Sequence, residues 1–144
     1  MDRTYKLYSS LPDLERRKTW AEIDLDALRR NYRLLREMAT AEDPSVRMIA
    51  VVKAEAYGHG APACVETLLS EGCDFFAVSC MDEAVAVRSV CDENHREADI
   101  LVLGYTPPEL ALQLARYDIH SIEQPIRQHQ WQDMARLCRE SPLP

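Results

Sequence analysis

The run over residues 48–60 constrains the fold more than any other part of the sequence. Residues 48–52 are all apolar, which is typical of a strand buried on both faces inside a parallel sheet. Lys53 follows directly, and Gly58 and Gly60 come a few residues later. In α/β folds, the carboxyl ends of the strands and the loops after them form the ligand sites. A lysine held there, partly out of water, can attack an aldehyde as the neutral amine, which is the chemistry of a Schiff base with pyridoxal phosphate (PLP).

Helix and strand patterns alternate along the rest of the chain. Asp24 can cap a helix that continues to about Met38. The apolar face of this helix is formed by Leu28, Tyr32, Leu35 and Ala39. Further strands are expected over residues 75–79, 100–103 and 119–122, and helices over residues 61–72, 82–90, 106–117 and 125–139. Repeated strand–helix units with short connections predict a parallel sheet. By this pattern alone, a small open four-stranded sheet and part of a barrel are equally possible.

Length and charge limit the classes of protein. With 144 residues, 47% of them hydrophobic, the chain suits one domain with its own core. A net charge of −7 and a pI near 5.1 argue against binding to nucleic acid or to an anionic membrane. The sequence has no apolar run long enough for a membrane span and none that resembles a signal peptide. We expect residues 1–17 to be a flexible leader and residues 92–99 to form a charged surface loop.

The five cysteines indicate a reducing compartment and argue against a metal site. They include no CxxC pair, and their number is odd. This usage favours reduced structural thiols in the cytoplasm over disulfides or metal binding.

The sequence around the lysine is similar to a known family. Residues 53–60 read Lys-Ala-Glu-Ala-Tyr-Gly-His-Gly, which resembles the PLP-lysine signature of alanine racemases. The flanking segments that also resemble this family are residues 19–28, 76–79, 82–84 and 100–104. These pieces occur in the family's order and at about its spacing, from residue 18 to about residue 139.

The resemblance decides between the two folds. Alanine racemases carry a (β/α)₈ barrel of the TIM type followed by a β-rich C-terminal domain, and such a barrel normally takes about 250 residues. We therefore expect residues 18–144 to be the N-terminal half of the PLP-binding barrel domain, with about four β/α units and without the C-terminal domain. Half a barrel has two open edges of apolar strand, which predicts association with another copy or with other chains.

The resemblance also assigns roles within the motif. Lys53 would be the catalytic residue, binding PLP covalently and acting as one of two bases that move the α-proton. Tyr57 would bind the cofactor by donating a hydrogen bond from its hydroxyl to the phosphate. We expect His59 to be structural, orienting the loop or capping the helix after it. Glu55 departs from the family, which usually has asparagine here, and we expect it to point away from the cofactor.

Two carboxylates further along the chain are expected to have no chemical role. Asp82 and Glu83 begin a helix, where negative charge is favoured by the helix dipole. Adjacent helical residues do not face each other, so we interpret both as a solvated helix start.

The implied function is that of a PLP-dependent alanine racemase, an isomerase that interconverts L- and D-alanine and supplies D-alanine for the cell wall peptidoglycan. In the family, the second base is a tyrosine from the partner subunit's C-terminal domain, and arginines from later segments contact the pyridine nitrogen and the substrate carboxylate. None of these residues has a counterpart here, so we expect little activity from this chain alone. We also expect a homo-oligomer and a small-molecule amino-acid substrate. The alternatives are a racemase for another small amino acid such as serine, a non-enzymatic PLP-binding module, a related decarboxylase, or an inert self-associating fragment.

Overall fold

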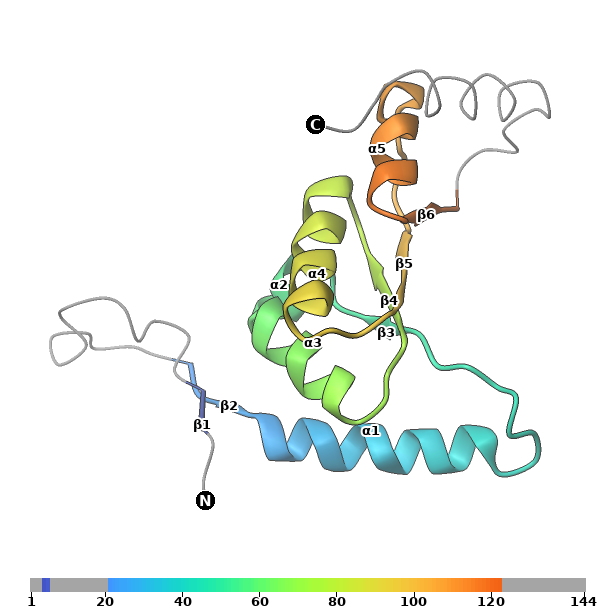
Figure 1. The fold of residues 1–144 in the computed structure, drawn as a ribbon. Helices are drawn as coiled ribbons and strands as arrows, with labels where there is room; N and C mark the ends of the chain where they lie inside the picture. Colours follow the sequence, from blue (N-terminus) through green and yellow to red (C-terminus); the bar gives the residue numbers. More distant parts are fainter. Residues whose placement is uncertain (1–3, 6–20, 123–144) are drawn as a thin grey trace, which may run out of the picture.

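The computed structural model describes residues 4–5 and 21–122, and its helices and strands alternate as predicted (Figure 1). Its strands are β1 (Thr4–Tyr5), β2 (Ile23–Asp24), β3 (Ala50–Val51), β4 (Phe75–Val78), β5 (Asp99–Val102) and β6 (His120–Ser121). Its helices are α1 (Leu25–Thr40), α2 (Lys53–Gly58), α3 (Ala61–Ser70), α4 (Met81–Glu93), the 3-10 helix η2 (Pro108–Leu110) and α5 (Ala111–Arg116). The helix predicted over residues 125–139 lies outside the described residues.

Four of the strands form one parallel sheet in the order β3-β4-β5-β6. Each strand pairs with the next one along the chain, so Ala50 lies opposite Phe76, and Phe76 lies opposite Ile100. The pairing extends past β3, because the amide of Val52 donates to the carbonyl of Ala77 at 2.8 Å. The predicted parallel sheet is confirmed, although β3 is shorter than the strand expected over residues 48–52.

Helix α1 begins as the sequence predicts. The amide of Ala27 donates to Oδ1 of Asp24 at 2.8 Å, and this backbone hydrogen bond lowers the pKa of the Asp24 carboxyl. In the first half of the helix, Leu25 and Tyr32 are buried against the core. Burial raises the pKa of the Tyr32 phenol to about 12, so it stays neutral.

The predicted apolar face of α1 does not continue to its end. Leu35 is 55% exposed, and Ala39 is exposed as well. The reason is that α1 runs past the end of α3, where Glu71 accepts hydrogen bonds from Arg33 (2.7 Å) and Arg36 (3.2 Å). The apolar side chains of Leu34, Leu35 and Met38 are accordingly more than half exposed.

The core lies between the sheet and the pair α3 and α4, which lie together on one side of the strands (Figure 1). Alternate strand residues fill it, and the largest of them, fully buried, are Phe76, Val78, Ile100 and Val102. The opposite face is only partly open, since Val51 on the edge strand is 40% exposed whereas Ala77 beside it is fully buried. The prediction that the first strand is buried on both faces is therefore wrong for Val51.

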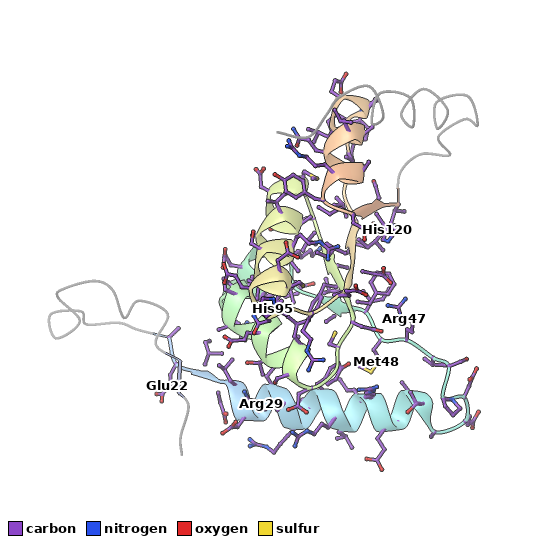
Figure 2. The ribbon with its side chains drawn as sticks, viewed as in Figure 1. Glu22, Arg29, Arg47, Met48, His95 and His120 are labelled. Carbon is purple, nitrogen blue, oxygen red and sulfur yellow. The ribbon has the colours of Figure 1, made fainter. Side chains whose placement is uncertain are left out.

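The amino-terminal edge of the sheet carries a charged cluster on this partly open face. The guanidinium of Arg47 lies 5.0 Å from the centre of the Phe75 ring and 2.7 Å from a carboxylate oxygen of Asp99. Nε2 of His120 lies 3.5 Å from the other carboxylate oxygen of Asp99. Arg47 and His120 are labelled in Figure 2. The hydrogen bond from Arg47 lowers the pKa of the Asp99 carboxyl. The cluster thus joins the segment before β3 to the starts of β5 and β6.

Several boundaries differ from the sequence prediction. Helix α4 continues to Glu93, into the segment expected to be a charged loop, and the helix expected over residues 106–117 begins as η2 and continues as α5. In the segment expected to be a flexible leader, Thr4–Tyr5 pair with β2 as an antiparallel strand. In the part of the chain that the structure describes, no helix has both the length and the apolar character needed to cross a bilayer.

We predict that this chain associates in solution. Strands β3 and β6 are the edges of the described sheet, and Val51 on β3 is an exposed apolar side chain, so both backbone edges and side chains favour a partner. Sedimentation velocity over a concentration series, with and without PLP, measures this. We expect the mean sedimentation coefficient to rise with concentration, and a stable monomer at tens of micromolar with a cooperative melt would contradict the prediction.

Candidate active site

Lys53 lies where the sequence predicts, directly after β3 at the carboxyl edge of the parallel sheet. It is half-buried, and Val52 before it is buried. Because the Val52 amide is bonded to β4, the backbone that carries the lysine is continuous with the sheet. This is the edge at which ligands bind in barrels of parallel strands.

The segment after Lys53 is not an open loop but a left-handed helical turn. Residues 54–57 have φ between 50° and 56° and ψ between 36° and 53°, although none is glycine. Left-handed geometry costs an L-residue about 1–2 kcal/mol, so the surrounding structure must hold this turn in place. Gly58 and Gly60 continue with φ of 84° and 86°. A Cβ on Gly58 would meet no atom within 4 Å, so its backbone angle, and not lack of space, accounts for the glycine.

Local hydrogen bonds hold the turn from within. The amide of Ala56 donates to the carbonyl of Val52 at 2.9 Å, and the amide of Gly60 donates to the carbonyl of Glu55 at 2.8 Å. Nδ1 of His59 lies 2.8 Å from the carbonyl oxygen of Ala56, so this ring nitrogen carries the hydrogen that it donates. The contact agrees with the prediction that His59 orients the loop.

Glu83 holds the same turn from another element, and the sequence analysis missed it. Its Oε1 accepts from the amide of Ala54 at 2.7 Å, while its Oε2 accepts from the amide and the hydroxyl of Ser79, each at 2.8 Å. The prediction of a solvated helix start agrees with the exposure of Asp82 and is wrong for Glu83. The only signal in the sequence was a carboxylate in the first turn of a helix, which occurs in many helices.

The environment of Glu83 keeps it charged. Burial raises the pKa of its carboxyl, but the hydrogen bonds from Ser79 and Ala54, together with the positive charge of Lys53, outweigh burial and leave that pKa below its usual value. Glu83 is therefore an ionised acceptor at neutral pH, with both oxygens engaged. The positive charge of Lys53 is close enough to act on the Glu83 carboxylate.

Glu55, the departure from the family motif, has a structural partner. Its Oε2 accepts from the amide of Ala61 at 3.2 Å, at the start of α3. The N-cap residue of this helix is Gly60, which has no side chain to cap it. Glu55 therefore supplies the acceptor that the helix start lacks.

Tyr57 is on the same turn as Lys53, and the structure leaves it accessible. Its side chain is 60% exposed, four residues after the lysine. The two site residues predicted from the sequence are thus presented by one short turn at the carboxyl edge of the sheet. Close packing also fixes this edge, because a Cβ on Gly104 would lie 2.3 Å from the carbonyl oxygen of Ser79.

The cysteines of the described region do not form a reactive site. Burial raises the pKa of the Cys64, Cys73 and Cys91 thiols, so they are poor nucleophiles at neutral pH. Cys80, after β4, is exposed. Within residues 4–5 and 21–122, no group of three His, Cys, Asp or Glu side chains could hold a metal ion.

The match to known proteins identifies the family. A family model described as the N-terminal domain of alanine racemase matches residues 23–142. The chain belongs to the alanine racemase family. The alanine racemase of Carboxydothermus hydrogenoformans is 38% identical over 103 residues, which are 72% of this chain and 26% of that protein. The chain therefore spans about a quarter of the length of this curated relative.

Solved structures of the family share the fold. The alanine racemase of Clostridium difficile 630 matches with a TM-score of 0.65 and 29% identity, over 80% of this chain and 28% of that one. The alanine racemase of Bartonella henselae with covalently bound pyridoxal phosphate matches with a TM-score of 0.61 and 28% identity, over 82% and 32% of the two chains. A histidine racemase from Leuconostoc mesenteroides matches with a TM-score of 0.54 and 28% identity, over 66% of this chain and 23% of that one. The predicted fold class, part of a (β/α)₈ barrel, is confirmed.

We predict that Glu55→Gln destabilises the chain by about 0.5–1 kcal/mol, because it removes a negative charge that accepts a hydrogen bond at a helix start. Glu66→Gln is the matched control, since Glu66 is an exposed carboxylate on the same helix. Denaturant unfolding of the two variants and the parent chain measures the difference. Equal stability of both variants would show that the Glu55 contact contributes nothing.

Proposed function

We propose that this chain carries the cofactor-binding lysine of a PLP-dependent alanine racemase, which interconverts L- and D-alanine for the cell wall. The observation that carries the proposal is the position of Lys53, half-buried at the carboxyl end of β3 and followed by a left-handed turn held from two elements. Membership of the alanine racemase family supports the same reaction.

The residues present fit PLP, which offers an aldehyde to an amine and a phosphate to hydrogen-bond donors. Lys53 would hold the cofactor through its amine, and the exposed hydroxyl of Tyr57 is a neutral donor suited to the phosphate. When bound, PLP supplies a sink for the negative charge left on the substrate carbon as its α-proton leaves. The structure of the Bartonella henselae alanine racemase with covalently bound PLP supports this assignment.

The proposed role of Lys53 extends to proton transfer. The neutral amine of Lys53 would be placed to take the α-proton from one face of the substrate. The turn restricts the backbone of the lysine, so the amine samples few positions, and such restriction is what positions a catalytic base. Glu83, ionised and close to Lys53, gives the lysine a negative neighbour on the protein side.

Substrate, assembly and location belong to the same proposal. We propose alanine as the substrate because the matching family model and the curated relative carry that name, while the histidine racemase neighbour indicates that this barrel also serves another amino acid. The partly open face and the edges of the described sheet support a homo-oligomer. Three buried free thiols and one exposed one suit a reducing cytoplasm.

We predict that PLP labels Lys53 selectively. The chain has three lysines, Lys6, Lys18 and Lys53; Lys53 follows β3 at the carboxyl edge of the parallel sheet, and the other two lie outside the described residues. Incubation with PLP, reduction with borohydride and peptide mapping should place the label on Lys53. A dominant label on either of the other lysines would refute the proposal, and equal labelling of all three would indicate surface chemistry.

The same experiment tests Tyr57. We expect Tyr57→Phe to raise the PLP concentration needed for half-labelling about tenfold, since it removes one hydrogen bond to a charged group. Tyr117→Phe is the control, because Tyr117 precedes β6 and therefore lies toward the amino-terminal edge. An equal effect of both substitutions would refute a phosphate contact by Tyr57.

We predict that this chain alone racemises alanine at a rate many orders of magnitude below that of a complete alanine racemase. One base exchanges a proton on one face only, whereas racemisation needs delivery to the opposite face and a positioned substrate. Conversion of L-alanine to D-alanine, followed by chiral chromatography with Lys53→Ala as the control, measures this. Turnover close to that of a complete enzyme, abolished in Lys53→Ala, would contradict the prediction.

A further inference from the structure

We infer that Glu83 is a positioning residue for the lysine site: its carboxylate joins the left-handed turn after β3 to the end of β4 and thereby fixes the direction in which Lys53 leaves the sheet. The inference rests on the proposed function in one respect, because it concerns the capture of PLP by Lys53. The fixing of the turn can be measured without PLP.

The conformation of the turn creates the need for such a residue. Four consecutive non-glycine residues are left-handed, at a combined cost of several kcal/mol. Strain of this kind persists only when surrounding contacts restrain the backbone at more than one point. Within the turn, the carbonyls of Val52, Glu55 and Ala56 accept from the amides of Ala56, Gly60 and His59. Among the described residues, no backbone carbonyl accepts from the first amide of the turn, that of Ala54.

Glu83 supplies that acceptor from 29 residues away. Ala54 is the residue directly after Lys53, and it is exposed. Its amide would exchange freely with water without this bond. Fixing it fixes the peptide plane on the carboxyl side of the lysine, which limits where the Lys53 side chain can point.

The two oxygens of Glu83 have separate partners, which distinguishes it from an ordinary helix cap. Oε2 binds the amide and the hydroxyl of Ser79, and this part resembles the capping of α4. Oε1 accepts instead from the amide of Ala54 in α2. A residue needed only for capping would not require the second oxygen to reach the turn after β3.

Asp82 provides the comparison on the same helix turn. It is also a carboxylate in the first turn of α4, so it has the same favourable interaction with the helix dipole. It is exposed, and among the described residues no hydrogen bond to its carboxylate is found. Removing its charge therefore tests the dipole effect without disturbing the link between β3 and β4.

The experiment compares Glu83→Gln, Asp82→Asn and Ser79→Ala in the full chain. Glutamine keeps the shape of Glu83 but has one acceptor oxygen, for which the amide of Ala54 and the two donors of Ser79 compete. Ser79→Ala removes one capping donor and leaves the Ala54 contact intact. The two measurements are hydrogen exchange at the Ala54 amide, made without PLP, and the apparent Kd for PLP from the circular dichroism of the bound chromophore.

We expect Glu83→Gln to accelerate exchange at Ala54 about tenfold and to raise the apparent Kd for PLP about tenfold. Asp82→Asn and Ser79→Ala should change both quantities less than twofold. Unchanged exchange at Ala54 in Glu83→Gln would overturn the inference, and so would faster exchange with an unchanged Kd. Equal effects of Asp82→Asn would also overturn it, because the loss of either negative charge at the start of α4 would then have the same consequence. If the parent chain binds no PLP at Lys53, the proposed function fails, and exchange at Ala54 alone decides whether Glu83 fixes the turn.

Discussion

The left-handed turn after β3 is the constraint on which the rest of the site depends. Residues 54–57 adopt a backbone conformation that their side chains disfavour, and contacts on both sides maintain it. Ala54 is bonded to Glu83, Glu55 to the start of α3, and the ring of His59 to Ala56. Through these bonds the turn is attached to two helices at once. Lys53 and Tyr57, at its two ends, are therefore placed by the fold and not by local preference.

The two edges of the sheet differ in what their charges do. At the amino-terminal edge, Arg47 and Asp99 pair across the start of the strands, and the exposed positions of both groups make this a modest contribution to stability. At the carboxyl edge, Glu83 accepts hydrogen bonds from the backbone amides of Ala54 and Ser79, and the positive charge of Lys53 helps to lower the pKa of its carboxyl. The division agrees with barrels in general, in which the amino-terminal face serves stability and the carboxyl face carries the chemistry.

The described part of the chain has the packing of an incomplete barrel. Phe76 and Ile100 are fully buried under α3 and α4, whereas Val51 and Ile49, on the face away from these helices, are 40% and 45% exposed. In a closed barrel of this family, inward-facing side chains fill the interior in layers. The exposure of these apolar residues thus follows from the share of the barrel that the described residues contain, and it explains why association is expected.

The sequence by itself determined the elements, the family and the position of the lysine. Apolar runs set the parallel strands, Asp24 capped α1, and the motif placed Lys53 and Tyr57 after the first strand of the sheet, because these are local signals in neighbouring residues. Only the tertiary structure decided the left-handed turn and the role of Glu83. The residues of the turn individually favour right-handed geometry, so their own preferences predict no such turn. Glu83 reaches its partner across 29 residues, and a contact of that separation exists only once β3 and β4 have paired.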